Sequence, residues 1–389
     1  MNMLLKTAVG SFCMLTAIAG AQAETTSSGN QNASVIGNLK KIDVVASTVP
    51  SNGDVNPYGV AEVENTVGKL ISGHILVSNF NNSGNLQGTG TTIVDIAPDG
   101  KTSVFAELDA KSLPGPCPGG IGLTTALVVL SQGWVVVGSL PTADGTSATA
   151  KAGCLIVLDS MGKPVETFFG SLINGPWDMT AFERGNEAKL FVTNVLDGTV
   201  AANGQTVAKG TVLRLDLQLS SSHKPNLQAM TVVGAGFDQR TDPAALVIGP
   251  TGVALSPTPG NSNSNSNSNS DRGIVLYVAD TLNNRIAVID RPLTRTTPVE
   301  RAGRTLTSGG SLNNPLGLVT TPEGHLLTVN GGDGFITEIT PSGRQIAKVQ
   351  LDNTGGPPPG AGTLFGLVFD PARGVLFVDD GSNTLNILH

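Results

Sequence analysis

One unit of three short strands recurs along the chain and constrains the fold more than any other feature. Its clearest copy lies at 250–290, where runs of Val, Ile, Leu and Ala alternate with short polar turns. Weaker copies begin near residues 56, 122, 174, 313 and 364. Repeats of one sheet-forming unit indicate a propeller or a solenoid, and the spacing of about 50–75 residues exceeds the about 40–50 of a typical blade. Long loops account for the difference.

The two ends of the chain complete this pattern. The last copy has only three predicted strands, at 364–369, 375–380 and 384–388, whereas a propeller blade has four. The chain also begins with a lone predicted strand at 41–49, which can pair with the last blade and cover its exposed edge. The sequence therefore predicts an all-β, six-bladed β-propeller of four-stranded antiparallel blades, with the last blade closed by the N-terminal strand. The 49 glycines and the low charged fraction of 14% agree with this class.

The repeat residues resemble a known family. Pro-x-Gly-Val-Ala at 250–254, followed by Leu-Tyr-Val-Ala-Asp-Thr-x-Asn-Asn-Arg-Ile at 276–286, is similar to the NHL repeat. The similarity is clearest in the fourth copy, fair in the fifth and sixth, and covers most of 50–388 in outline. It implies a six-bladed propeller but no single activity, because such propellers include lyases, lactonase-like enzymes and binding modules.

The N-terminal residues have the features of an export signal. A lysine precedes an apolar run at 8–19, and Ala21-Gln22-Ala23 fits a cleavage site, so we expect a signal peptide at 1–23 and a periplasmic or secreted protein. The polar stretch 24–40 is expected to be a disordered leader. Residues 41–389 are expected to form a single propeller domain, and the Asn-Ser alternation at 261–270 a flexible insert within it.

Two cysteines remain after cleavage at Ala23. In an oxidising compartment Cys117 and Cys154 are expected to form one disulfide, the alternative being two free thiols. The net charge of −7 argues against nucleic acid as a partner. No later stretch has membrane-spanning length. We expect a monomer whose partner is an unidentified protein or small molecule.

Glycine recurs at the start of the predicted inner strands, where it permits close backbone packing near the axis. Gly59, Gly252, Gly317 and Gly366 hold this position, and Asp178 replaces glycine in the third copy. Large apolar residues precede it, and they either line the channel mouth or pack between blades. The candidate ligand-binding residues at this mouth are Tyr58, Trp177, Asp178 and Phe365.

The loops between the second and third strands are long in the first three copies, at 79–90, 139–153 and 195–210, and short in the others. Both cysteines belong to the face that carries these loops. Long loops on a rigid scaffold often bind ligands, although loop insertions also accumulate neutrally. The sequence therefore favours a binding scaffold without catalysis, acting through the loop-rich face of blades one to three.

A recurring Asn or Asp ends the second strand of most copies. Such residues form turns, but carboxylate and amide oxygens are also the ligands that calcium takes. The candidate metal ligands are Asn194, Asp280, Asn330 and Asp380. The alternative function is thus a metal-dependent, lactonase-like or lyase-like hydrolytic enzyme with an Asn/Asp site at the channel mouth. No cofactor is expected for the binding scaffold, and calcium is the cofactor considered for the alternative, since no two histidines have metal-site spacing. No catalytic residue is identified from the sequence.

Overall fold

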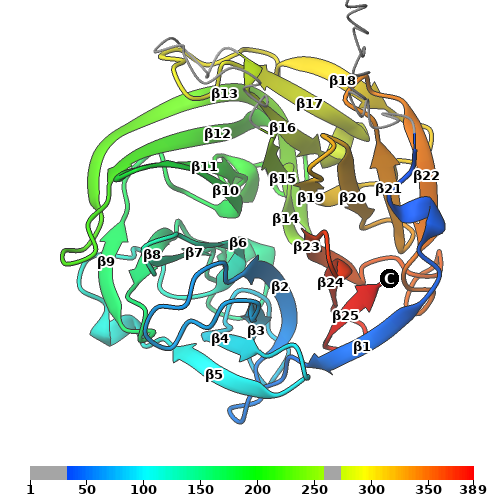
Figure 1. The fold of residues 1–389 in the computed structure, drawn as a ribbon. Coiled ribbons are helices and arrows are strands. Elements are labelled where there is room, and N and C mark those ends of the chain that lie inside the picture. The colour runs from blue at the N-terminus through cyan, green and yellow to red at the C-terminus, as the bar shows by residue number, and fades with distance from the viewer. Residues whose placement is uncertain (1–32, 258–272) are drawn as a thin grey trace, which may run out of the picture. The chain divides into compact units, whose positions relative to one another are not determined.

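The predicted propeller is confirmed. A computed structural model describes residues 33–257 and 273–389, and its strands form six antiparallel sheets set around a central axis (Figure 1). The predicted signal peptide and the Asn-Ser insert lie outside the described residues. Among the described residues, no helix has both the length and the apolar character needed to cross a membrane.

The first three blades follow one another in chain order. Blade one consists of β2 (Val55–Glu62), β3 (Ile75–Asn81), β4 (Thr92–Ile96) and β5 (Thr102–Glu107). Blade two consists of β6 (Leu123–Val129), β7 (Val135–Ser139), β8 (Cys154–Leu158) and β9 (Pro164–Phe168). Blade three consists of β10 (Pro176–Arg184), β11 (Glu187–Asn194), β12 (Val207–Gln218), β13 (Asn226–Asp242) and β14 (Leu246–Ile248). Blade three is enlarged, because β14 adds a fifth strand and β13 is 17 residues long.

The last three blades have four strands each. They are β15 (Pro250–Leu255), β16 (Val275–Asp280), β17 (Arg285–Asp290) and β18 (Arg304–Ser308); β19 (Pro315–Thr320), β20 (Leu326–Asn330), β21 (Phe335–Ile339) and β22 (Gln345–Gln350); and β23 (Leu364–Asp370), β24 (Gly374–Asp379), β25 (Thr384–Leu388) and β1 (Ile42–Ser47). Only blade six combines strands from the two ends of the chain.

The N-terminal strand closes the ring as predicted. β1 lies antiparallel to β25, with Ile42 opposite Leu388 and Ser47 opposite Thr384. Backbone hydrogen bonds between Lys41 and His389 extend the pairing by one step. The otherwise open edge of β25 is therefore covered, which removes a template for pairing with another chain.

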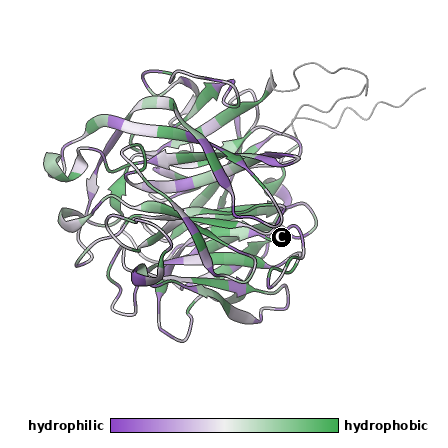
Figure 2. Cartoon of the chain, turned by 90° about the vertical axis from the view of Figure 1, so that its left-hand side faces the viewer, coloured by the Kyte–Doolittle hydropathy of each residue, from purple (hydrophilic) through white to green (hydrophobic). Residues whose placement is uncertain are grey.

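The middle strands of each blade read as continuous apolar runs because they are buried on both faces. Every residue of β3 and of β8 is buried, whereas the outermost strand β5 has only two buried residues and β22 has only half-buried and exposed ones. Each middle strand is covered by the neighbouring blades, which explains the weak two-residue alternation in the sequence. Figure 2 shows hydrophobic residues along many of the strands, with hydrophilic residues both between them and in the loops.

Adjacent inner strands meet at the predicted glycine positions. A Cβ on Gly366 would lie 2.2 Å from the carbonyl oxygen of Tyr58 in the next blade, and one on Gly317 would lie 2.2 Å from that of Phe365. The same crowding occurs at Gly252, 2.1 Å from the carbonyl oxygen of Leu316. No side chain fits at such distances, so glycine at these positions allows the ring of inner strands to close around the axis.

The prediction of a disordered leader reaching residue 40 is wrong for residues 34–38. Ile36–Asn38 form a short 3-10 helix, and the Ile36 side chain is fully buried. The buried carboxylate of Glu338 accepts hydrogen bonds from Ser34 Oγ (2.6 Å) and from the backbone N–H groups of Val35 and Ile36 (2.9 and 3.0 Å). A carboxylate buried in blade five thus holds a polar segment that composition alone assigns to disorder.

The predicted disulfide is present between Cys117 and Cys154. Cys154 begins β8, and Cys117 lies in the connection that leads into β6, so the bond fixes two loops on one face of blade two. The linked residues are separated by 37 positions.

Removing this disulfide should lower the free energy of unfolding by about 3–4 kcal/mol, because a loop of this length restricts the unfolded chain strongly. The measurement is chemical denaturation of a variant carrying both Cys117→Ser and Cys154→Ser. Reduction of the unaltered protein should give a loss of similar size. A loss below about 1 kcal/mol in both cases would show that the bond contributes little to the stability of blade two.

Candidate functional site

Two cavities lie along the propeller, on opposite faces. We call the face where the inner strands begin the rim face; it carries the long loops after β3, β7 and β11. The face where the inner strands end is called the entry face. One cavity lies within the ring of inner strands toward the entry face, and the other lies on the rim face.

The central cavity is lined by all six inner strands and has a volume of about 420 Å³. Each strand supplies residues to its wall, among them Val60, Thr125, Asp178, Val253, Leu318 and Leu367. Most of the lining residues are apolar, but polar atoms make up the larger part of the exposed surface of the cavity. A concave cavity that combines apolar walls with a few polar groups is the usual form of a small-molecule site.

Asp178 is the buried carboxyl group of this cavity. Its side chain takes the position that glycine holds in four other blades, and it is 9% exposed. Oδ1 accepts a hydrogen bond from the Met179 N–H (2.8 Å), and Oδ2 accepts one from the Val253 N–H in blade four (3.2 Å). Burial raises the pKa of Asp178 from 3.8 to about 7, and the two backbone donors lower it only in part. The group therefore exchanges its proton near neutral pH.

The raised pKa of Asp178 predicts a pH dependence of stability. The unfolded chain ionises this carboxyl near pH 3.8 and the folded chain near pH 7, so the folded state binds the additional proton between these values. The contribution of Asp178 to stability should be fully present below about pH 4, fall by about 4 kcal/mol as the pH rises to about 7, and then level off. Denaturation curves of the unaltered protein and of Asp178→Asn between pH 4 and pH 8 measure this; equal slopes for the two would contradict it.

The entry to the central cavity is acidic. Glu62 at the end of β2, Glu64 just beyond it, and Glu183 near the end of β10 all contribute to its lining. Glu64 is solvent-exposed and Glu183 partly so, which places the opening of the cavity on the entry face.

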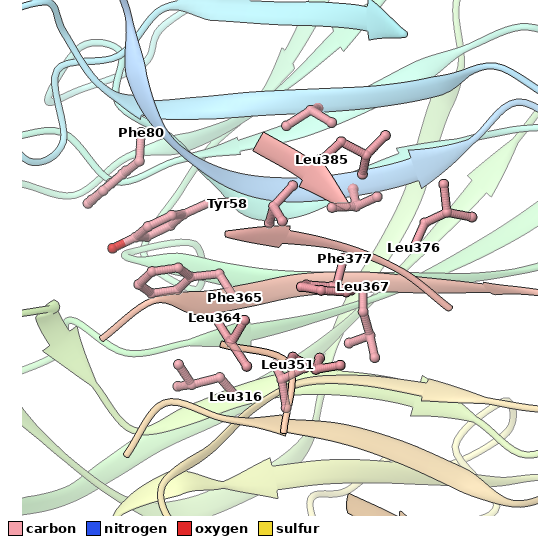
Figure 3. Close-up of a cluster of buried hydrophobic side chains, with 14 of the residues drawn as sticks. Tyr58, Phe80, Leu316, Leu351, Leu364, Phe365, Leu367, Leu376, Phe377 and Leu385 are labelled. Atoms are coloured by element: carbon pink, nitrogen blue, oxygen red, sulfur yellow. The ribbon is translucent and has the colours of Figure 1, made fainter. Parts of the chain in front are cut away.

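An aromatic cluster closes the axis at the other end of the central cavity. The Tyr58 ring stacks on Phe365 with centroids 3.9 Å apart and on Phe80 at 4.5 Å (Figure 3). The centroid of the Trp177 ring lies 6.2 Å from that of Tyr58. All of these side chains are at most 4% exposed. The Tyr58 and Trp177 rings pack between blades, whereas Phe365 packs against Tyr58 and also lines the cavity on the rim face. Asp178 alone among the predicted ligand-binding residues lines the central cavity.

The second cavity lies on the rim face and has a volume of about 600 Å³. It spans blades three to six, from Asp242 and Thr281 to Asn313, Pro357 and Phe365. The long loops of blades one and two contribute nothing to it. The cavity therefore lies mainly over blades four to six, which have the shorter loops, and blade three forms the rest of its wall.

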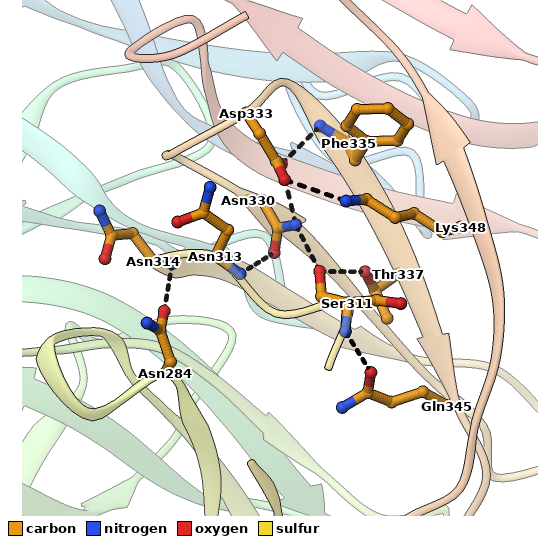
Figure 4. Close-up of polar contacts among 10 residues, drawn as sticks. All are labelled: Asn284, Ser311, Asn313, Asn314, Asn330, Asp333, Phe335, Thr337, Gln345 and Lys348. Atoms are coloured by element: carbon orange, nitrogen blue, oxygen red, sulfur yellow. Dashed lines mark hydrogen bonds and ion pairs between the residues drawn. The ribbon is translucent and has the colours of Figure 1, made fainter. Parts of the chain in front are cut away.

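Three of the predicted metal ligands are engaged in the turns that hold their blades together. Asp280 forms an ion pair with Arg285 (2.7 Å) and accepts from Asn283 Nδ2. Asn330 Oδ1 accepts from the Asn313 N–H (3.1 Å), and its Nδ2 donates to Ser311 O and Asp333 Oδ1, as Figure 4 shows. These contacts are the turn chemistry expected of short polar side chains.

Asn194 has the same kind of role, since its Oδ1 accepts from the Asn174 N–H (3.3 Å). Asp380 differs, because burial and the neighbouring Asp379 raise its pKa to about 7. Within residues 33–257 and 273–389, no three His, Cys, Asp or Glu side chains lie close enough to share a metal ion. Asparagine oxygens are not among these groups, so the predicted site of Asn194, Asp280, Asn330 and Asp380 stays a prediction, and we derive no chemical step through a metal.

Sequence reasoning missed the three glutamates of the entry. Glu64 and Glu183 each follow the repeat position of their strand, Gly59 and Asp178, by five residues, and Glu62 follows Gly59 by three. Both inner strands have a bulge at the repeat position and pair without a further shift beyond it. The shared spacing of five is therefore a signal in the sequence that could have found Glu64 and Glu183.

Comparisons with known proteins identify the fold. No protein-family model matches the chain and no curated protein sequence matches it, so the similarity to the NHL repeat remains an interpretation of the repeat residues. A gluconolactonase from Xanthomonas campestris shares the fold with a TM-score of 0.52 and 15% identity, over 90% of this chain and 89% of that one. A luciferin-regenerating enzyme gives 0.51 and 11%, over 89% and 93%. At these identities the likeness shows that the chain shares the six-bladed propeller fold with two enzymes, and it shows the fold alone.

Proposed function

We propose that the protein is a hydrolytic enzyme for small esters, with lactones as the favoured class, and that Asp178 is its general base in the central cavity. The observation that carries the proposal is the position of a buried carboxyl with a pKa of about 7 in the wall of a cavity of about 420 Å³. A general base works best when its pKa lies near the working pH. The fold shared with a gluconolactonase supports the choice of lactones.

The proposed reaction needs only the substrate, one water molecule and this carboxylate. The water oxygen bonds to the ester carbonyl carbon while Asp178 takes a proton from the water. Asp178 then returns this proton to the leaving alkoxide as the C–O bond of the ester breaks. The product of a lactone is an open-chain hydroxy acid. The two backbone N–H groups that hold Asp178 fix its orientation. A fixed orientation of the base lowers the entropic part of the activation barrier.

The proposal is tested with purified protein and a panel of unsubstituted lactones and aryl esters, assayed by proton release at constant pH. We expect hydrolysis whose kcat/KM rises with pH through an inflection near 7, because Asp178 must lose its proton to act as a base. Hydrolysis should persist after dialysis against a metal chelator. A panel that stays inert from pH 6 to pH 9 would contradict the proposal.

A second candidate is ligand binding without catalysis on the rim face. The cavity of about 600 Å³ there supports it, since this volume is enough for a drug-sized molecule. Its wall combines apolar residues such as Leu316 and Phe365 with the polar side chains of Asn313 and Thr281. An inert ester panel, together with a small-molecule ligand whose affinity falls in Asn313→Ala, would favour this candidate.

A further inference from the structure

The central cavity carries acidic side chains and no basic ones. Its lining includes Glu62, Glu64, Asp178 and Glu183, and no lysine, arginine or histidine among the described residues contributes to it. The distribution of these groups matters more than their number. Asp178 lies inside the ring, while the three glutamates lie where the cavity opens on the entry face.

One of the three entry glutamates pairs with an arginine. The carboxylate of Glu62 accepts a hydrogen bond from Arg373 (2.9 Å), which also pairs with Asp370 in blade six. Burial raises the pKa of Glu62, and the Arg373 guanidinium lowers it in part. Glu62 therefore adds less to the negative potential of the entry than an unpaired carboxylate would, although Arg373 is shared with Asp370.

The other two glutamates have no cation among their contacts within the described residues. Glu183 accepts hydrogen bonds from the Ser131 N–H (3.0 Å) and from Ser131 Oγ (2.7 Å), and these neutral donors fix its position without cancelling its charge. Glu64 is exposed, and no described residue forms a hydrogen bond or ion pair with its carboxylate. Glu64 comes from blade one and Glu183 from blade three, so they flank the opening from two sides.

We propose that this acidic entry restricts the site to uncharged substrates and drives out the carboxylate product, an inference that rests on the proposed hydrolytic function. Two like charges beside an opening with low-dielectric walls produce a focused negative potential, which lowers the local concentration of anions. Hydrolysis of an uncharged lactone turns a neutral molecule into a hydroxy acid that is ionised at neutral pH. The same potential therefore admits the substrate, repels its product, and excludes lactones that already carry a carboxylate or phosphate.

The potential at the entry can be measured without any turnover. Amide-proton relaxation is recorded with two small nitroxides of similar size, the cationic aminomethyl-PROXYL and the anionic carboxy-PROXYL. We expect amides beside the entry, such as Thr180 and Val128, to relax at least threefold faster with the cation than with the anion at low salt. The ratio should fall toward one at 0.5 M salt, since such interactions are screened. Equal relaxation by both probes at low salt would overturn the proposal.

Kinetics then test the substrate class. We expect kcat/KM for γ-butyrolactone to exceed that for a γ-butyrolactone carboxylic acid by tenfold or more. In the variant with both Glu64→Gln and Glu183→Gln, the ratio of the two kcat/KM values should fall at least threefold, because the KM for the acid decreases. Glu187→Gln is the matched control. The exposed carboxylate of Glu187 comes just after the turn that Glu183 precedes, but it does not line the cavity. An unchanged gap in the double variant overturns the role of the entry.

The two proposals fail in different ways. If neither lactone is hydrolysed, the hydrolytic function is overturned and the substrate assignment with it, while the nitroxide measurement still decides the sign of the potential at the entry. If γ-butyrolactone and its carboxylic acid are hydrolysed equally well, hydrolysis stands and the selection by charge is overturned.

Discussion

Replacing Asp178 with asparagine is expected to lower kcat for ester or lactone hydrolysis by about 10²- to 10⁴-fold. Asparagine has nearly the same shape but cannot take a proton from water. Its single carbonyl oxygen can accept from either the Met179 or the Val253 N–H, but not from both as the carboxylate does. The fold should therefore persist. The variant loses the free energy of one hydrogen bond, but near neutral pH this loss is smaller than the free energy gained because no ionisable group is buried. The measurement is kcat on the ester that the unaltered protein hydrolyses fastest.

The matched control for this variant is Asp95→Asn. Asp95 is also 9% exposed, but it lies on β4 of blade one and pairs with His74 (2.9 Å) away from the cavity. Its replacement should leave kcat per folded molecule unchanged. Residual hydrolysis by Asp178→Asn should also lose the inflection near pH 7. An Asp178→Asn variant that keeps more than half of kcat would show that the base lies elsewhere.

Replacing Gly366 with alanine is expected to destabilise the propeller by about 3 kcal/mol or more, as overpacking of a crowded site does. The new methyl group would lie 2.2 Å from the Tyr58 carbonyl oxygen and 3.1 Å from Val60 Cγ2. Backbone must move to relieve the first contact, and it must do so where blade six meets blade one. The measurement is the free energy of unfolding from chemical denaturation, with circular dichroism to confirm the β-structure of the variant.

Gly84→Ala is the matched control for Gly366→Ala. Gly84 lies in the loop after β3, and a Cβ there would approach only side-chain atoms, the nearest being Asn82 Oδ1 at 3.2 Å. Its replacement should change the free energy of unfolding by less than about 0.5 kcal/mol. Gly317→Ala, which places a methyl group 2.2 Å from the Phe365 carbonyl oxygen, should behave like Gly366→Ala. Small effects in both variants would contradict the role of glycine in closing the inner ring.

The ring could be predicted from the sequence because its determinants are local and repeated. The repeated glycines mark inner strands that touch across blades. The missing fourth strand of the last copy and the orphan strand near the N-terminus together indicate closure, and the pairing of Ile42 with Leu388 confirms it. The disulfide was predictable for a similar reason, since only two cysteines follow the predicted cleavage site and both belong to one face of one blade.

The candidate site was only partly predictable, because it depends on depth along the axis. Tyr58, Trp177 and Phe365 precede the repeat position in sequence, and their rings pack toward one another. Of the three, Phe365 also lines the cavity on the rim face, which the sequence alone does not reveal. Asp178 was recognised at the glycine position, yet its effect depends on the cavity that it lines. The order of residues 34–38 depends on Glu338, about 300 positions away, which no local pattern reveals.

The most direct test of the central claim is the titration of the Asp178 carboxyl by ¹³C NMR, with its signal assigned by difference against Asp178→Asn. Assignment by difference is needed because Asp380 is also expected to titrate near pH 7. A midpoint near pH 7 is the predicted result, because burial in the cavity wall disfavours the charged form. A midpoint near pH 4 would contradict it, since Asp178 would then be an ordinary ionised residue that joins blades three and four, and the argument for hydrolysis in the central cavity would lose its base.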